Sequence, residues 1–176
     1  MASPKAYKAQ GKKGMSEAIT VRNASVQDVP LILTFIRELA EYERLSHAVV
    51  ATEENIRESL FGARPYAECV FACIGTEAVG FALFFHNYST FLGQAGLYLE
   101  DLYVQPSARG KGVGRKLLAY LAQLAVERNC GRLEWAVLNW NTPAINFYQG
   151  IGARPNSEWT TYRLAGEALE RLSEES

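Results

Sequence analysis

The sequence predicts an α/β (α+β) domain with a central mixed sheet, and three observations favour this class. The chain has 176 residues, which suits one domain, and 48% of them are hydrophobic, enough to supply a full core. Short strand-like apolar runs alternate with stretches of helical periodicity. Their order combines a β-hairpin with strand–helix–strand units, which implies a mixed sheet with helices packed on it.

The first predicted elements are a short strand and two capped helices. Residues 19–23 have the composition of a strand, and Ser25-Val26-Gln27-Asp28 resembles a capping box at a helix start. The apolar residues of the helix that follows fall on one side, namely Val29, Ile32, Leu33, Ile36, Leu39 and Ala40. Thr52 is placed to cap a second helix, which is expected to end at Gly62.

The middle of the chain predicts a hairpin followed by a third strand. Residues 69–74 and 79–88 form the hairpin, joined by a Gly-Thr-Glu-Ala turn, and residues 97–105 form the next strand. Cys69 and Cys73 share one face of the first hairpin strand, because side chains alternate along a strand. We expect both thiols to pack in the core rather than to bind metal or carry redox chemistry.

The last third of the chain continues the strand–helix alternation. A helix over residues 112–128 carries one apolar stripe, made of Val113, Leu117, Leu118, Leu121, Leu124 and Ala125. Residues 133–138 form a strand and residues 142–149 a helix, and residues 159–164 are expected to complete the sheet. The segment 166–172 is amphipathic.

Composition excludes several classes of protein. The net charge of −1 gives no reason to expect nucleic acid as a partner. Three cysteines do not suggest a disulfide framework, so a reducing cytoplasm is expected. No apolar stretch approaches the ~20 residues of a membrane span. Residues 1–14 are polar and lysine-rich, and we expect a disordered or vector-derived extension before a single domain over residues 15–176.

Residues 99–118 are the most informative part of the chain. They predict an apolar strand, a basic loop with the spacing Arg109-x-x-Gly112-x-Gly114, and then a helix. A helix start exposes backbone N–H groups and the positive end of the helix dipole, which together bind phosphates. Glycines at 110, 112 and 114 let a diphosphate approach the backbone, and Arg109, Lys111 and Arg115 add positive charge.

The spacing of this loop excludes two common phosphate-binding motifs. In a Gly-x-Gly-x-x-Gly dinucleotide fingerprint starting at Gly110, the third glycine would fall on Arg115. A Walker loop needs Gly-Lys followed by Ser or Thr, which the chain lacks. A simple strand–helix turn without a ligand remains the alternative interpretation.

A second motif narrows the class of ligand that the loop is expected to bind. Residues 133–153 predict a strand followed by a helix, with Asn141 as N-cap and Pro143 in the first turn. Together the two segments resemble the Gcn5-related N-acetyltransferase (GNAT) superfamily, through the loop and the pattern Asn141, Ala144 and Tyr148. Further blocks resemble the diamine (spermidine/spermine) and thialysine N-acetyltransferases: Glu38-Leu39-Ala40-Glu41-Tyr42-Glu43, Tyr98-Leu99-Glu100-Asp101, Trp140-Asn141 and Asn146-Phe147-Tyr148.

This resemblance runs from about residue 19 to about residue 164 and implies a fold and a coenzyme. The implied fold is a mixed, mostly antiparallel sheet with splayed middle strands, flanked by about four helices. The implied co-substrate is acetyl-CoA, whose pantetheine arm pairs with strand backbone near residues 102–104. The implied coenzyme contacts are Leu102, Tyr103, Val104, Arg109, Gly110, Lys111, Gly112, Val113, Gly114, Arg115, Asn141, Ala144 and Tyr148.

The resemblance also implies the chemistry. Tyr148 would be the general acid, because a phenol with a pKa of roughly 10 is protonated at neutral pH and can donate to a leaving thiolate. The alternative is that Tyr148 only packs, and Asn141 could cap its helix with or without touching CoA. No metal is expected, since His47 and His86 lie in no ligand cluster.

Glu100 and Asp101 are the candidate residues on the amine side. Two adjacent acids in an apolar strand are unusual, because burying a carboxylate is unfavourable without a partner. They point to opposite faces of a regular strand, and a bulge could bring them closer. The resemblance implies that Glu100 takes up the amine proton directly or through water, while Tyr42 and Glu43 add to an acidic pocket. Glu43 on a solvated helix face is the alternative.

The chain departs from the polyamine enzymes after the long hairpin strand. Those enzymes have an acidic residue and a tryptophan where this chain has Tyr88-Ser89-Thr90-Phe91. Ser89 removes a carboxylate that would attract a second ammonium group, and Phe91 keeps an aromatic wall. We therefore predict an N-acetyltransferase for a small cationic amine such as a lysine-like amino acid or short diamine. A protein or peptide acetyltransferase and a non-catalytic acyl-CoA-binding module are alternatives, and the relatives imply a homodimer.

Overall fold

The computed structural model describes residues 18–175, and this part of the chain divides into two compact units that meet in sequence between Ala136 and Val137. The expected extension over residues 1–14 lies outside the described residues. The expectation of a single domain from residue 15 onward stays a prediction. Each unit is described by itself below.

The first unit is built on a five-stranded sheet in the order β1-β2-β3-β4-β5. Neighbouring strands are antiparallel except for β4 and β5, which are parallel, so the predicted mixed and mostly antiparallel sheet is confirmed. The strands are β1 (Ile19–Asn23), β2 (Glu68–Ile74), β3 (Glu77–Ser89), β4 (Gln94–Val104) and β5 (Leu133–Trp135).

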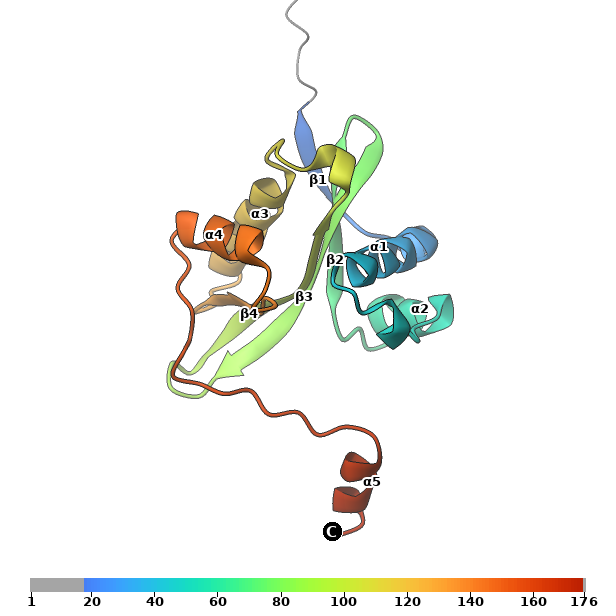
Figure 1. Ribbon diagram of the computed structural model, residues 1–176, viewed down its shortest axis with the longest axis vertical. Coiled ribbons are helices and arrows are strands. Elements are labelled where there is room, and N and C mark those ends of the chain that lie inside the picture. Colours follow the sequence, from blue (N-terminus) through green and yellow to red (C-terminus); the bar gives the residue numbers. More distant parts are fainter. Residues whose placement is uncertain (1–17, 176) are drawn as a thin grey trace, which may run out of the picture. The chain divides into compact units, whose positions relative to one another are not determined.

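Three helices cover the two faces of this sheet (Figure 1). The helices α1 (Val29–Tyr42) and α2 (Glu53–Phe61) lie on one face, and α3 (Val113–Glu127) lies on the other. As predicted, Thr52 caps α2: its hydroxyl accepts a hydrogen bond from the backbone N–H of Asn55 at 3.2 Å. The helix α1 starts directly after a short 3₁₀ turn over Val26–Asp28.

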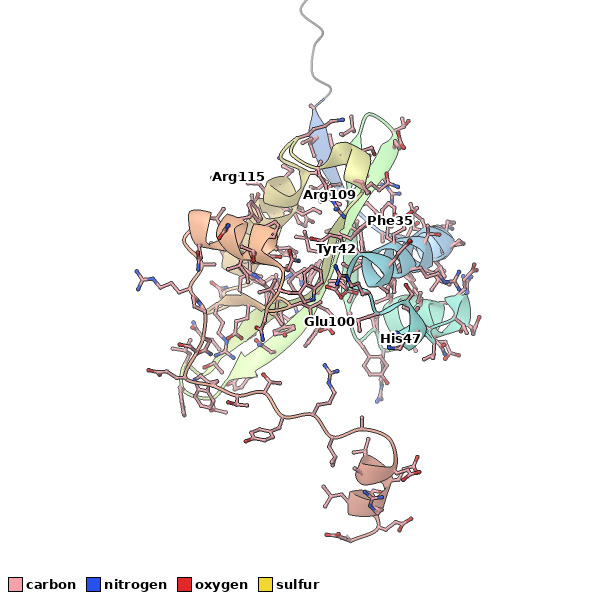
Figure 2. All side chains as sticks on the ribbon, viewed as in Figure 1. Phe35, Tyr42, His47, Glu100, Arg109 and Arg115 are labelled. Atoms are coloured by element: carbon pink, nitrogen blue, oxygen red, sulfur yellow. The ribbon has the colours of Figure 1, made fainter. Side chains whose placement is uncertain are left out.

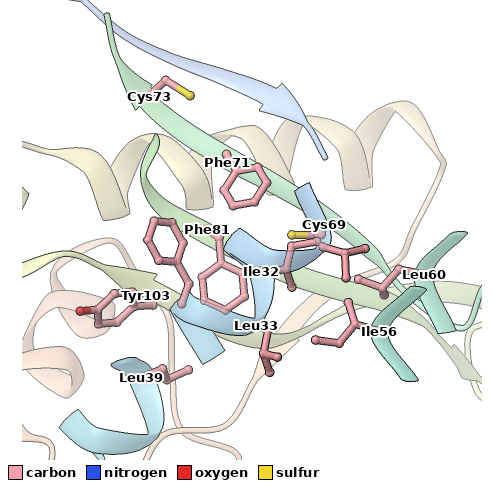
Figure 3. Close-up of a cluster of buried hydrophobic side chains, with 12 residues drawn as sticks. Ile32, Leu33, Leu39, Ile56, Leu60, Cys69, Phe71, Cys73, Phe81 and Tyr103 are labelled. Atoms are coloured by element: carbon pink, nitrogen blue, oxygen red, sulfur yellow. The ribbon is translucent and has the colours of Figure 1, made fainter. Parts of the chain in front are cut away.

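The core under α1 and α2 is rich in aromatic side chains (Figure 3). Phe35 of α1 packs against Phe71, Phe81 and Tyr103 of three different strands, with ring centroids 5.8–5.9 Å apart. Cys69 and Cys73 are buried free thiols on this side of the sheet, which confirms the predicted packing. Burial raises the pKa of Cys69 to about 12, so this thiol is not a nucleophile at neutral pH.

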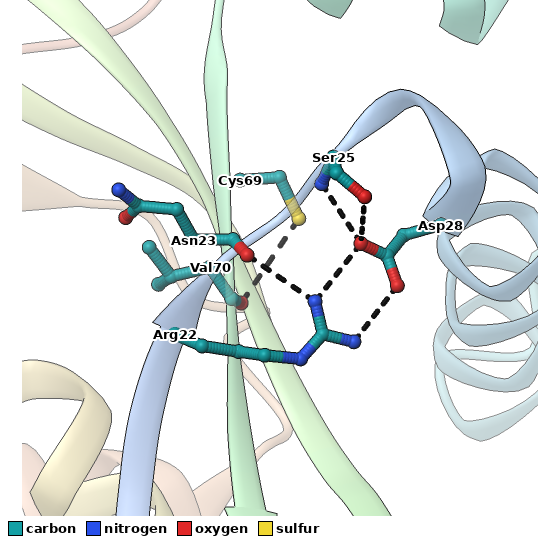
Figure 4. A network of polar contacts seen from close by, with 6 residues as sticks. All are labelled: Arg22, Asn23, Ser25, Asp28, Cys69 and Val70. Atoms are coloured by element: carbon teal, nitrogen blue, oxygen red, sulfur yellow. Dashed lines mark hydrogen bonds and ion pairs between the residues drawn. The ribbon is translucent and has the colours of Figure 1, made fainter.

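A polar cluster joins β1 to the start of α1 (Figure 4). Arg22 donates two hydrogen bonds to the Asp28 carboxylate at 2.8 and 2.9 Å. The backbone N–H and the hydroxyl of Ser25 each donate to the same carboxylate at 2.8 Å. The Arg22 hydrogen bond holds the pKa of Asp28 well below its usual range, although burial acts in the opposite direction.

Replacing Asp28 by Asn should therefore destabilise the protein. We expect the free energy of unfolding at pH 7 to fall by about 1–3 kcal/mol, because charge-assisted hydrogen bonds are lost from a half-buried group. The pKa is lowered in the folded state, so this contribution is fully present well above the unfolded pKa of ~3.9 and is lost progressively as the pH falls from there through the folded pKa. Urea unfolding at pH 7 and pH 3 tests both statements.

The matched control for this prediction is the exposed ion pair Arg57–Glu54, whose closest N–O distance is 3.7 Å. Replacing Glu54 by Gln should change the free energy of unfolding by less than about 0.5 kcal/mol. Equal losses in the two variants would contradict the importance of the Arg22–Asp28 cluster.

The strand boundaries differ from the prediction in three places. The hairpin turn between β2 and β3 contains only Gly75 and Thr76, because Glu77 already pairs with Ile74. The strand β4 begins at Gln94, where it pairs with Ser89, rather than at residue 97. The strand β5 ends at Trp135 rather than at residue 138, since pairing with β4 stops there.

The second unit contains two helices, α4 (Thr142–Gly150) and α5 (Glu167–Ser173). The predicted strand over residues 159–164 is wrong: these residues lie outside the helices and strands of the described chain. Trp159 and Tyr162 are 69% and 92% exposed. Aromatic residues favour a strand only where they have a neighbouring strand to pack on, and the five described strands provide none for this segment.

None of the helices within residues 18–175 combines the length and hydrophobicity needed to cross a membrane.

Candidate functional site

The edge of β4 that faces β5 is only partly paired. Residues Leu97, Tyr98 and Leu99 pair with β5, whereas residues 100–104 continue without a β5 partner. On its other side β4 stays paired with β3 as far as Val104, which lies opposite Gly80. The predicted splay of the middle strands is therefore present, and it leaves backbone groups of residues 100–104 without a ladder partner on the β5 side.

A β-bulge lies at the point where the strands diverge. Phe84 of β3 pairs with Leu99 and Leu83 pairs with Asp101, so Glu100 is an extra residue in β4. A bulge re-aims side chains and often lies beside a functional site. Here Glu100 is exposed and Asp101 is half-buried, and both lie at the start of the unpaired edge.

The two acids interact with a third from α1. Burial, followed by the charges of Glu100 and Glu43, raises the pKa of Asp101 to about 6. Burial also raises the pKa of Glu43, which directly follows the last residue of α1. Glu43, Glu100 and Asp101 thus form one cluster, called the acidic cluster below. Carboxylates within electrostatic reach of one another attract a cationic ligand, and an acid that titrates near pH 6 can exchange protons at neutral pH.

The loop before α3 has the backbone geometry of an anion site. Gly110 and Gly112 have φ values of 73° and 87°, a left-handed conformation that disfavours other residues. The first backbone hydrogen bond of α3 runs from the N–H of Lys116 to the carbonyl of Gly112, so the N–H groups of residues 113–115 precede the helical ladder. Lys111 and Arg115 are exposed beside them. These features fit a bound diphosphate.

The side chain of Arg109 is directed toward β4 and α1 (Figure 2). Its Nε–H donates to the carbonyl of Val104 at 3.0 Å. Its guanidinium carbon lies 4.6 Å from the ring centroid of Tyr42 and 5.8 Å from that of Tyr103. The composition and spacing of the loop predicted that Arg109 would add positive charge near a phosphate. They contained no signal for its contact with the Tyr42 ring.

In the second unit, α4 has the predicted N-terminus. The Asn141 side-chain oxygen accepts a hydrogen bond from the Ala144 N–H at 3.3 Å, and Asn141 is only 8% exposed. Tyr148 lies two turns further along α4 and is half-buried, with its ring centroid 5.5 Å from that of Phe147. Asn141, Ala144 and Tyr148 are therefore carried by one short helix.

Phe91 is the predicted site residue that the structure places far from the others in the first unit. It lies in the turn between β3 and β4 and is 91% exposed. Asp101 pairs with Leu83 toward the opposite end of this long hairpin. The register thus gives no support for Phe91 as a wall beside the acidic cluster of the same chain.

Comparison with known proteins identifies the family. Residues 34–153 match the model of the acetyltransferase (GNAT) family, which is more than half of the chain. The chain belongs to the GNAT family. It is an acyltransferase that transfers acetyl groups to amines, and the co-substrate of this family is acetyl-CoA.

Individual GNAT relatives and structures agree with this assignment. The chain is 39% identical over 167 residues to a thialysine N-epsilon-acetyltransferase of Sus scrofa, covering 89% of this chain and 98% of the relative. It is 34% identical to the L-ornithine N5-acetyltransferase NATA1 of Arabidopsis thaliana, covering 86% of both chains. An integron cassette protein from the mobile metagenome of V. cholerae has a similar structure, with a TM-score of 0.75, 28% identity and coverage of 91% and 99%.

Within this GNAT domain, sequence reasoning missed two features. Glu38 of α1 lies beside the buried Tyr103, and burial and the Glu38 charge raise the pKa of that phenol. The stacking of Arg109 on Tyr42 links α1 to the loop before α3. No group of three or more His, Cys, Asp or Glu side chains within the described residues could hold a metal ion.

Proposed function

We propose that this GNAT enzyme transfers the acetyl group of acetyl-CoA directly to a primary amine of a small cationic substrate, such as a lysine-like amino acid or a short diamine. The observation that carries this proposal is the acidic cluster at the start of the unpaired β4 edge. Two relatives support it, because their names specify thialysine and L-ornithine, which are both amino acids with a second amine.

The coenzyme is proposed to bind on two backbone surfaces. The N–H groups of residues 110–115 would hold the diphosphate, with Lys111 and Arg115 adding charge. The unpaired edge at Leu102, Tyr103 and Val104 would pair with the pantetheine arm, and one N–H there could polarise the thioester oxygen. Acetyl-CoA supplies the activated acetyl group. Asn141 and Ala144, at the start of α4, complete the proposed contacts.

The proposed chemical roles follow from the ionisation of each group. Glu43 and Asp101 hold the ammonium group, and Tyr42 lines the same end of α1. Glu100, exposed at the bulge, takes up the amine proton through water, so that the neutral amine can attack the thioester. Tyr148 donates a proton to the departing thiolate. No metal takes part in this scheme.

A steady-state assay of CoA release tests the substrate class. The panel contains thialysine, lysine, ornithine, short diamines, spermidine, spermine and lysine-containing peptides. We expect the lysine-like amino acids and short diamines to have the largest kcat/KM values. Much faster turnover of spermine would contradict the proposed substrate, faster turnover of peptides would favour a protein acetyltransferase, and coenzyme binding without any turnover would favour a non-catalytic module.

We also propose a cytoplasmic homodimer. The free thiols of Cys69, Cys73 and Cys130 are consistent with a reducing compartment. Several large apolar side chains of the second unit are exposed in the single chain, namely Trp159, Tyr162, Leu164, Leu169 and Leu172. Such side chains are typical of a surface that another chain covers. Sedimentation equilibrium of the full chain tests the oligomeric state, and a monomer at micromolar concentration would contradict it.

A further inference from the structure

Arg109 makes contacts that a simple phosphate-binding arginine would not need. Its Nε–H group donates to the Val104 carbonyl, and its guanidinium carbon lies over the ring of Tyr42. The first contact is to the last residue of β4, and the second is to the last residue of α1. One side chain from the loop therefore contacts the ends of two different elements.

The charge and shape of Arg109 suit this position. A planar guanidinium group can stack on an aromatic ring while an N–H group in its plane donates to a carbonyl, whereas a lysine ammonium cannot do both in the same way. Tyr103 lies on the same side at 5.8 Å, and the Glu38 carboxylate of α1 lies beside that phenol. Glu38 and Tyr42 are one turn apart on α1, so this helix end lies beside β4 through Glu38 and contacts the loop through Tyr42.

The end of α1 carries part of the acidic cluster. Glu43 directly follows Tyr42 and lies within electrostatic reach of Asp101. A movement of Tyr42 would therefore change where the Glu43 carboxylate lies relative to Asp101. On the other side, Arg109 directly precedes Gly110, and the backbone of Gly110 and Gly112 is proposed to close around the diphosphate.

We propose that Arg109 is a positioning residue that ties the last turn of α1 to the end of β4, so that coenzyme bound on residues 110–115 strengthens amine binding at the acidic cluster. This inference rests on the proposed function, but the contacts of Arg109 with Tyr42 and Val104, called the Arg109 tie below, exist in the free protein. Coenzyme binding orders the backbone at Gly110, which limits the movement of Arg109 and, through its stacking on Tyr42, the movement of Glu43.

Hydrogen–deuterium exchange of the free protein tests the Arg109 tie without a measurement of enzyme activity. In the Arg109→Gln variant, the amides of residues 42–45 should exchange about five- to tenfold faster, as expected for loss of a cation–π contact and one hydrogen bond. Addition of CoA should slow these amides in the natural protein and not in the variant. The control is Arg37→Gln, an exposed arginine on α1, which should leave the exchange unchanged.

Kinetics of amine acetylation then test the coupling. Arg109→Gln and Tyr42→Leu should each raise the KM for the amine by about five- to tenfold, with a smaller change in kcat. The double variant should be no worse than Arg109→Gln alone, because that variant has already lost the contact with Tyr42. Arg109→Lys keeps the charge, and its amine KM should stay close to that of Arg109→Gln.

Three outcomes would overturn the inference. One is unchanged exchange of residues 42–45 in Arg109→Gln. Another is a higher CoA dissociation constant in Arg109→Gln that returns to the natural value in Arg109→Lys, while the KM for the amine is unchanged in both. That result would mean that the side chain acts as a positive charge for the phosphate. The third is full additivity of the two single variants. Faster exchange in Arg109→Gln together with no turnover of any amine would instead contradict the proposed function and leave the Arg109 tie standing.

Discussion

Replacing Tyr148 by Phe is expected to lower kcat by about 10²–10³-fold, the usual contribution of a positioned general acid. The change removes one hydroxyl group and keeps the ring that packs beside Phe147. In the proposed mechanism, the departing thiolate of CoA would then lack its proton donor. Because the interaction is made only in the transition state, kcat and kcat/KM should fall together.

The control for this variant is Tyr162→Phe, which removes the same hydroxyl from a side chain of the same unit that is 92% exposed. Its kcat should be that of the natural protein. The dissociation constant of CoA, measured by calorimetry, should stay within about twofold in both variants, since neither hydroxyl is needed to hold the diphosphate. A kcat for Tyr148→Phe within about threefold of the natural value would exclude Tyr148 as the general acid.

Replacing Asp101 by Asn is expected to lower kcat/KM for the amine by about 100-fold at pH 7.5. In the proposed site the ammonium group would then bind without one of its half-buried carboxylates, and such losses amount to about 3 kcal/mol. In the natural protein the pKa of Asp101 is raised to about 6, by burial first and by Glu100 and Glu43 next. Its kcat/KM should therefore fall as the pH drops below about 6, and the Asn variant should lack this fall.

The same substitution should stabilise the fold. Because the folded pKa of Asp101 lies above the unfolded value of ~3.9, the folded state binds the proton more tightly. Its contribution is thus most favourable at low pH and is lost as the pH rises from about 4 to about 6. Asp101→Asn should raise the free energy of unfolding by about 2 kcal/mol at pH 7.5 and by almost nothing at pH 4.

Denaturant unfolding and a pH–rate profile of the same two proteins check these results together. The matched control is Glu77→Gln, an exposed acid in the β2–β3 hairpin, which should change neither property. If Asp101→Asn destabilised the protein at pH 7.5, the charged carboxylate would make favourable contacts in the folded state. That result would contradict the interpretation that Asp101 lowers stability and serves amine binding.

Most of the helices and strands could be predicted from the sequence because their patterns are local. The apolar stripe from Val113 to Ala125 and the caps at Thr52 and Asn141 involve neighbouring residues, and the structure confirms them. The strand over residues 159–164 was wrong for the opposite reason. Its strand-forming side chains say nothing about whether another strand is available to pair with them.

The site shows the same division between local and distant information. Two adjacent acids marked Glu100 and Asp101 as unusual, but their placement depends on the register with β3, where Glu100 is the additional residue. The side chain of Arg109 was expected at a phosphate because of its loop. Its contact with Tyr42 depends on a helix that ends 67 residues earlier in the chain (109 − 42 = 67), and short-range spacing carries no information on that distance.

The additional residue at Glu100 makes the length of β4 part of its function. Deleting Glu100 would restore a regular pleat and keep every β3 pair, because Leu99 and Asp101 already pair with the adjacent residues Phe84 and Leu83. The deletion would remove both the exposed carboxylate and the bulge that directs it. Libraries aimed at a new amine specificity should therefore vary side-chain identity in this strand at constant residue count.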